Sequence, residues 1–171
     1  DAIVDADMLA ANAVTAGKLA SGVGGKILQV VTATTSTGVS NSSSNYASSG
    51  LSASITPSAT TSKILVLTSS AINMLGDGTS SSGRQCVLRL CRGDHTGTAL
   101  STVRIGISAQ GSHNTAPENN EVGCFSYLDS PNTTSSTTYT VAMAKHDNNV
   151  VIYAQVNGHY TSTMTLIEVA A

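Results

Sequence analysis

Apolar and polar residues alternate along most of the chain after residue 25, as they do in β-strands that bury one face. Val103, Ile105 and Ile107, for example, are separated by polar residues or glycine. Two runs, 64–67 and 150–152, are continuously apolar, which is typical of central strands covered on both faces. The pattern predicts eight or nine strands, within residues 26–34, 44–55, 63–74, 84–92, 100–107, 121–128, 137–146, 150–156 and 160–169.

Residues that favour turns separate these runs. Asn157-Gly158 lies between two predicted strands and favours a two-residue type I′ hairpin, and residues 147–149 predict a second hairpin. Gly93-Asp94 predicts a further turn. The antiparallel strands, with no amphipathic segment of helix length, predict an all-β fold, an antiparallel jelly-roll-like β-sandwich. Because the domain is small, strands covered on both faces indicate that the second face meets another subunit.

Residues 1–25 differ from the rest because they contain a repeat with a period of ten. Residues 4–10 (VDADMLA) align with residues 14–20 (VTAGKLA). In each copy a residue that favours a helix N-cap lies between two apolar residues at the positions of a hydrophobic staple. Each repeat therefore predicts an extended piece followed by about one helical turn, too short to be stable alone in water.

The apolar residues of this repeat have nothing within their own segment to pack against, which indicates self-association around a long axis. We therefore predict a short N-terminal stalk over residues 1–25 and a head domain over residues 26–171. The alternative for the first segment is a flexible alanine-rich linker. A chain that begins at Asp1 is expected to be a fragment of something longer. The residues predicted to be buried between chains are Val4, Leu9, Val14 and Leu19.

Composition supports a strand-rich, weakly charged protein. Of 171 residues only 11% are charged, against about 25% in ordinary soluble domains, whereas 25 are serine and 22 threonine. Such a composition is poor in helix formers. The net charge of -2, with eight scattered basic residues, argues against nucleic acid as a partner. No apolar run reaches the roughly 18 residues that a membrane span needs, so no membrane insertion is expected.

Residues that could carry catalysis or bind metal are few, and we expect no enzyme activity, cofactor or metal. The aspartates other than the first three fall among turn residues, where capping of the local backbone is their usual role: Asp77, Asp94, Asp129 and Asp147. Glu118 and Glu121 could pair in a polar loop, which keeps glycoside cleavage open as an alternative. The histidines lack zinc-motif spacing, although a three-fold axis could bring three copies of one histidine together: His95, His113, His146 and His159.

The three cysteines cannot form a complete set of disulfides within one chain. Cys86 and Cys91 are five residues apart in a predicted strand, which places them on opposite faces and too far apart to bridge. Cys86 or Cys124 is expected to be a small buried core residue. Arg92-Gly93-Asp94 spells a tripeptide that integrins bind, but a turn is the simpler interpretation.

Several segments resemble the distal, C-terminal domains of bacteriophage tail fibres, especially those of marine and cyanobacterial phages. The resemblance covers nearly the whole chain. The segments are VTAGKLA at 14–20, GKILQVV at 25–31, LSASITP at 51–57, TSKILV at 61–66, LRLCRG at 88–93, YLDSP at 127–131 and TLIEV at 165–169.

The resemblance implies a homotrimer with an intertwined stalk and a β-sandwich head, located in the virion. Its partners would be other phage tail or virion proteins and a host cell-surface polysaccharide or receptor, bound weakly by each of three heads. The alternatives are a capsid fibre or fibre-tail adaptor with a purely structural role, and a polysaccharide depolymerase. The resemblance supplies no catalytic motif.

The stalk is expected to join the head at residues 22–25, which leaves the opposite end or the flanks for binding. Because antiparallel strands alternate in direction, every second connection should lie at the opposite end. These connections are residues 35–43, 75–83, 108–120 and 147–149. The longest of these connections, 108–120, and residues 75–83 are the predicted contact surface, with Asp77, His113 and Asn114 as receptor-contact candidates.

Overall fold

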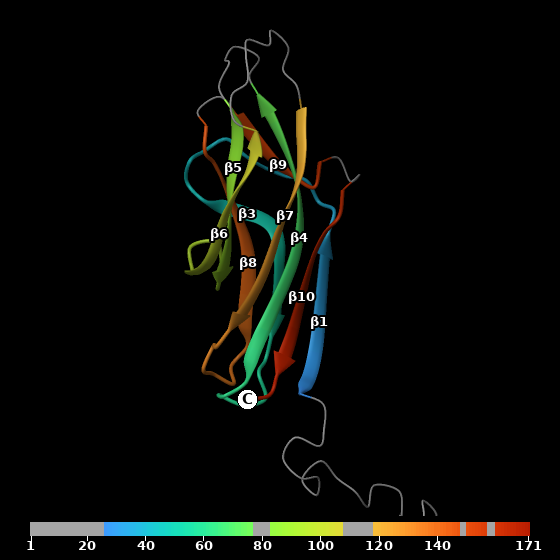
Figure 1. The fold of residues 1–171 in the computed structure, drawn as a ribbon, viewed down its shortest axis with the longest axis vertical. Helices are drawn as coiled ribbons and strands as arrows, with labels where there is room; N and C mark the ends of the chain where they lie inside the picture. Colours follow the sequence, from blue (N-terminus) through green and yellow to red (C-terminus); the bar gives the residue numbers. More distant parts are fainter. Residues whose placement is uncertain (1–25, 77–82, 108–117, 148–149, 157–159) are drawn as a thin grey trace, which may run out of the picture.

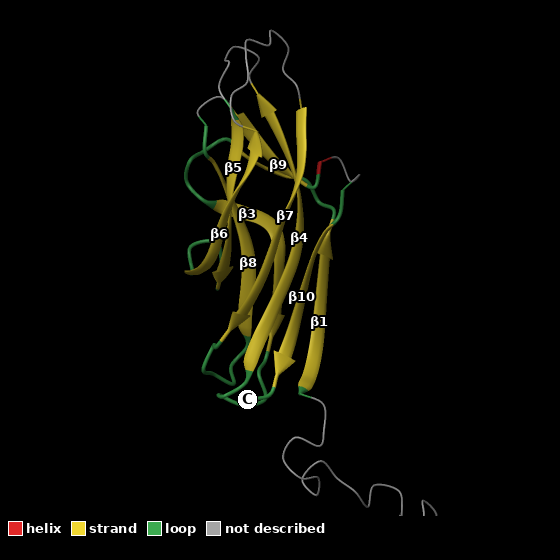
Figure 2. Ribbon diagram, in the orientation of Figure 1, coloured by secondary structure: helices red, strands yellow, loops and turns green. Residues whose placement is uncertain are grey.

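A computed structural model describes residues 26–76, 83–107, 118–147, 150–156 and 160–171. These residues form ten strands and no α-helix, arranged as two facing sheets (Figures 1 and 2). The strands are β1 (Ile27–Thr35), β2 (Val39–Asn41), β3 (Ala47–Ile55), β4 (Lys63–Gly76), β5 (Arg84–Arg92), β6 (Thr98–Ile107), β7 (Glu118–Asp129), β8 (Thr137–Lys145), β9 (Val150–Ala154) and β10 (Ser162–Val169). Every predicted run overlaps one of them, and only β2, too short to show a period, was not predicted.

The strand order is that of a jelly roll. The first sheet, here sheet A, has the order β1-β10-β4-β7, with β9 beside the far half of β4 and β2 beside β9. The second, sheet B, has the order β3-β8-β5-β6. All pairs are antiparallel, and successive long strands alternate between the sheets except for the β5–β6 hairpin. The predicted jelly-roll-like β-sandwich is therefore confirmed.

The core lies between the two inner faces. Along β10, for example, buried Met164 and Leu166 alternate with half-buried residues, as the period of two requires. Burying such a side chain contributes about 1.5–3 kcal/mol. The large side chains with the least exposure are Leu51, Ile64, Met74, Leu88, Leu90, Tyr139, Met143, Ile152, Met164 and Leu166.

The hairpin predicted at Asn157-Gly158 is wrong. Strands β9 and β10 both run antiparallel to β4 along the same edge, β10 beside the first half of β4 and β9 beside the second. The chain therefore continues in one direction across this interruption. Gln155 adopts a left-handed φ of 52° there, and its backbone N–H donates to the Ala71 carbonyl at 3.2 Å. The dipeptide predicts a local turn, but it does not determine which strands become neighbours in the sheet.

The hairpin predicted at residues 147–149 is also wrong, because β8 belongs to sheet B and β9 to sheet A. The connection crosses between the layers instead of joining neighbours. The turn predicted at Gly93-Asp94 is confirmed, since it joins β5 to its antiparallel neighbour β6, with Arg92 opposite Thr98.

The two ends of the sandwich carry different strand ends and connections. Ile27 pairs with Val169 at one end, where the C-terminus also lies (Figure 1). At the other end Gly76 pairs with Val150. The strand ends that flank residues 77–82, 108–117 and 148–149 share that second end, as expected for three of the four connections. The alternation does not hold throughout, because residues 35–43 contain β2 and because β9 and β10 run in the same direction.

Candidate functional site

The residues predicted for receptor contact and for the trimer interface lie outside the described part of the chain. This applies to Asp77, His113 and Asn114, and to Val4, Leu9, Val14 and Leu19. Their roles remain predictions. Two features of the described residues were not located from the sequence: a polar groove on sheet B and an apolar surface on sheet A.

The groove lies on the outer side of sheet B, beside the turn between β5 and β6. Its volume is about 690 Å³, and it is open to solvent. Six of its lining residues carry hydroxyl groups, and three others are arginine, aspartate and histidine. The lining residues are Ser48, Ser52, Arg92, Gly93, Asp94, His95, Ser136, Thr137, Thr138 and Thr140. Because they come from β3, the β5–β6 turn and the region of β8, no single sequence motif contains them.

Hydrogen bonds hold the β5–β6 turn against β8. Gly93 donates its backbone N–H to the Thr138 carbonyl at 2.7 Å, and Thr140 Oγ1 donates to the Gly93 carbonyl at 2.8 Å. Gly93 has a φ of 101°, a conformation that favours glycine. At Gly97 a Cβ would collide with the Arg92 carbonyl oxygen. The two glycines therefore allow the turn to fold tightly at the edge of the groove.

Asp94 caps this turn, as predicted. Its Oδ1 accepts from the Thr96 backbone N–H at 2.7 Å and from Thr96 Oγ1 at 2.6 Å. These hydrogen bonds lower the pKa of Asp94, so its carboxylate is ionised at neutral pH. The turn interpretation of the Arg92-Gly93-Asp94 sequence is confirmed, and the turn places one cation and one anion at the groove.

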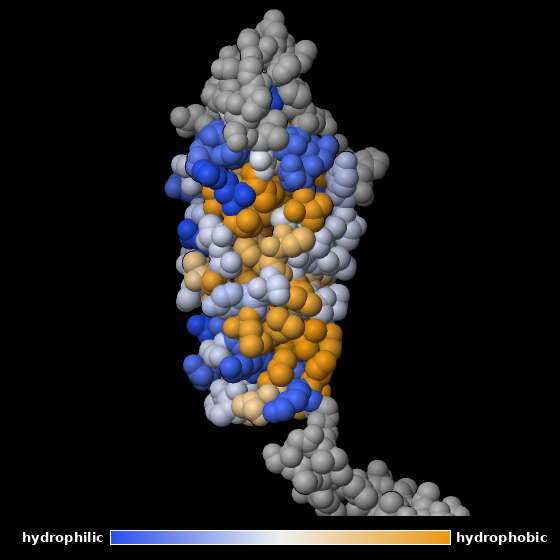
Figure 3. Space-filling model, in the orientation of Figure 1, coloured by the Kyte–Doolittle hydropathy of each residue, from blue (hydrophilic) through white to orange (hydrophobic). Residues whose placement is uncertain are grey.

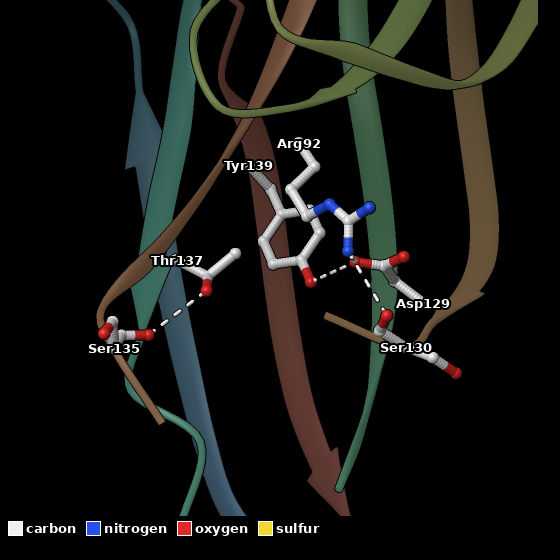
Figure 4. A network of polar contacts seen from close by, with 6 residues as sticks. All are labelled: Arg92, Asp129, Ser130, Ser135, Thr137 and Tyr139. Carbon is white, nitrogen blue, oxygen red and sulfur yellow. Dashed lines mark hydrogen bonds and ion pairs between the residues drawn. The ribbon is translucent and has the colours of Figure 1, made fainter. Parts of the chain in front are cut away.

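A buried polar network braces the groove from behind (Figure 4). Tyr139 donates its hydroxyl to Asp129 Oδ2 at 2.7 Å, and Arg92 Nη1 lies 3.3 Å from the same oxygen. Arg92 Nη1 also donates to the Ser130 carbonyl at 3.3 Å. Burial raises the pKa of Tyr139, and the hydrogen bond to Asp129 and its charge raise it further. The prediction that Asp129 caps a turn is therefore wrong, because its carboxylate is 5% exposed and joins three elements.

The outer side of sheet A is apolar at the end where residue 26 enters the head. The strand register places Val30, Ile167, Leu65 and Leu128 side by side across four strands. Val30 is 56% exposed and Leu128 49%. Figure 3 shows hydrophobic residues gathered over this part of β1, β10 and β4. We call these four residues, together with Leu28 and Leu67, the apolar face.

Glu168 is a buried carboxylate that the sequence did not single out. It accepts from Gln29 Nε2 at 2.6 Å and from both the backbone N–H and the hydroxyl of Ser58. Burial by itself would raise the pKa of Glu168, but hydrogen bonds from Ser58, Ser62 and Gln29 outweigh it and lower the pKa to about 2. This carboxylate ties β1 and the connection between β3 and β4 to β10, a structural role.

The remaining acids and thiols give no catalytic arrangement among the described residues. Glu118 and Glu121 lie in strand β7, so the expected polar loop is wrong at these positions. Among the residues that the structure describes, there is no group of three metal-ligating side chains and no helix that could span a membrane. All three cysteines are free. Cys86 is buried as expected, and Cys124 is exposed, which corrects the alternative core assignment.

Comparison with known proteins gives only distant structural likenesses. No protein-family model and no curated protein matches the sequence. A structure of infectious bursal disease virus Gx strain is 14% identical over 85% of this chain, with a TM-score of 0.33. The VP2 subviral particle of the same virus is 12% identical over 84% of this chain, with a TM-score of 0.32. The T13 viral particle is 14% identical over 84% of this chain, with a TM-score of 0.32. This chain spans 39%, 38% and 36% of those chains. The class of the fold, a jelly roll, rests on the strand order alone.

Proposed function

We propose that the chain is the distal part of a trimeric phage tail fibre, a structural virion protein that attaches to the host cell surface. The observation that supports this best is the apolar face on sheet A. It starts at the residues that follow segment 1–25, the segment whose repeat predicts self-association.

A further copy of the same chain fits the apolar face better than a charged partner does. Away from the residue-26 end, the next row of outward residues, Thr32, Thr165, Leu67 and Ser126, is also uncharged, whereas the row at that end includes Lys63 opposite Val169. A three-fold axis brings the same residues of three copies together, so a surface without charges suits a position at that axis.

Association through sheet A would leave sheet B and the end remote from residue 26 accessible. Three heads held together can bind repeated surface groups with a high effective concentration, so weak single contacts give firm attachment. This arrangement is the mechanism we propose for adhesion.

Two measurements test the proposal. Multi-angle light scattering of the full chain should give three times the 17.3 kDa monomer mass. Antibodies against the head should label the tips of tail fibres in electron micrographs of the virion. A monomer at micromolar concentration would contradict the trimer. Labelling of the capsid or of the fibre base would favour the structural alternatives, and new reducing ends in host polysaccharide would favour a depolymerase.

A further inference from the structure

The polar groove on sheet B is separate from the apolar face, because the two lie on the outer sides of opposite sheets. Its volume of about 690 Å³ falls within the range of small-ligand sites, about 300–1,000 Å³. An open groove suits a portion of a longer chain better than it suits an enclosed small molecule.

The groups around the groove are held in place before any ligand arrives. The turn bonds to β8 through Gly93, and Ser54 Oγ lies 2.8 Å from Thr138 Oγ1 in a cross-strand pair. Arg92 is fixed by Asp129, although its side chain remains 31% exposed. A ligand would therefore bind without much further ordering of the protein, which favours affinity.

The chemistry of the lining matches sugar hydroxyl groups. Serine and threonine hydroxyls both donate and accept hydrogen bonds, as sugar hydroxyls do. The carboxylate of Asp94 accepts from neighbouring sugar hydroxyls, and the guanidinium of Arg92 donates to sugar oxygens. Because Asp129 already pairs with Arg92, the charge of Asp94 is left uncompensated, so the groove favours a neutral ligand over a phosphate or a uronic acid.

We propose that this groove binds a neutral carbohydrate chain, with Asp94 and Arg92 as the charged contacts among the hydroxyls. The inference rests on the proposed function, because it names the ligand class of the adhesive head. It moves the contact from the predicted loops to the flank of the sandwich. Sugar binding by the groove and trimer formation by the chain are measured separately, so either proposal can fail while the other holds.

The test uses nuclear magnetic resonance spectra of the full chain labelled with ¹⁵N. Methyl α-glucoside, methyl α-galactoside and methyl α-mannoside are added in turn, with glucuronic acid as the charged comparison. At least one neutral glycoside should shift the amide signals of Gly93, Thr138 and Thr140. Absence of such shifts with all three neutral glycosides, or shifts with glucuronic acid alone, would overturn the proposal.

A matched pair of variants links any binding to the groove. Asp94→Asn keeps the size of the side chain and an oxygen that can accept from Thr96, but it removes the charge. It should weaken binding roughly tenfold, as expected for loss of a charged hydrogen bond. Asp147→Asn, beyond the far end of β8, should bind like the parent. Equal binding by Asp94→Asn and the parent would contradict the assigned contact, and light scattering of the same samples reports trimer formation independently.

Discussion

The outer faces of the two sheets differ in composition. Across sheet A one row of neighbouring residues reads Val30, Ile167, Leu65 and Leu128. Across sheet B a corresponding row reads Ser48, Ala142, Arg89 and Thr102. Both rows cross four antiparallel strands, and both sheets have apolar inner faces, so the difference does not arise from the fold.

The outer faces of the two sheets interact differently with water. The row on sheet A gains free energy when another surface covers it, at about 25 cal/mol per Å² of apolar area removed from water. On sheet B, Arg89 instead lies 3.6 Å from the centroid of the Tyr46 ring, and the polar groove lined with hydroxyl side chains lies on the same sheet. One face is therefore suited to association and the other to recognition of a polar ligand.

The largest expected effect comes from a charge placed on the apolar face. Leu128→Asp would bury an unpaired carboxylate between copies, which costs several kcal/mol, so the trimer should dissociate to monomers. Thr102→Asp adds the same charge to the outer face of sheet B and should leave the trimer intact. Sedimentation velocity measures both. Dissociation of both variants alike, or of neither, would remove the distinction between the faces.

A smaller effect is expected behind the groove. Tyr139→Phe removes the hydroxyl that donates to Asp129 and leaves a buried acceptor with one donor fewer. The free energy of unfolding should fall by about 1–3 kcal/mol. Tyr127→Phe, at a partly buried tyrosine of sheet A, is the matched control and should change stability less. Urea denaturation compares the two, and equal losses would show that the network contributes no more than an ordinary tyrosine hydroxyl.

The buried carboxylate of sheet A predicts a loss of stability in acid. The folded pKa of Glu168, about 2, is lower than its ordinary value of 4.5, so its contribution to stability is fully present above about pH 4.5 and is lost as the pH falls through about 2. Thermal unfolding should therefore show a drop in the melting temperature of the parent across this window. In Glu168→Gln the melting temperature should be lower at neutral pH and should fall less in acid. Parallel pH profiles would contradict the assigned role.

The smallest effect concerns thiol reactivity. Cys86 is buried, and burial together with the charge of Glu121 raises its pKa to about 12, so iodoacetamide should not modify it in the folded protein. Cys124 is exposed on the outer side of sheet A. Its modification should be slow in the parent trimer and severalfold faster in Leu128→Asp. Mass spectrometry of the labelled peptides measures both thiols, and equal rates at Cys124 would place it outside any contact.

Much of the fold could be predicted because the alternation of apolar and polar residues reports directly which strand positions face a core. The pairing of strands was less accessible. Asn157-Gly158 has the composition of a hairpin turn, yet both flanking strands pair with the same edge of β4. This pairing depends on the tertiary structure, and no local dipeptide encodes it.

The candidate sites were harder to predict for the same reason. The groove combines Ser48, Asp94 and Thr138 from distant parts of the chain, and only the strand order brings them together. Asp129 precedes a serine and a proline, which favours a turn, but the hydroxyl of Tyr139 determines its buried role. An available signal was the alternation of Ser52 and Ser54 in β3 and of Thr138 and Thr140 in β8 with apolar residues, which indicates a polar outer face.

Hydroxyl-radical footprinting of the full chain tests most directly whether copies of the chain cover sheet A. In the isolated head Val30 and Leu128 are 56% and 49% exposed, so both would be oxidised readily as monomers. The account predicts that both are protected in the parent protein, whereas Tyr46 on sheet B is oxidised in the parent and in Leu128→Asp alike. Oxidation of Val30 and Leu128 in the parent at the rate of unprotected aliphatic side chains would contradict it.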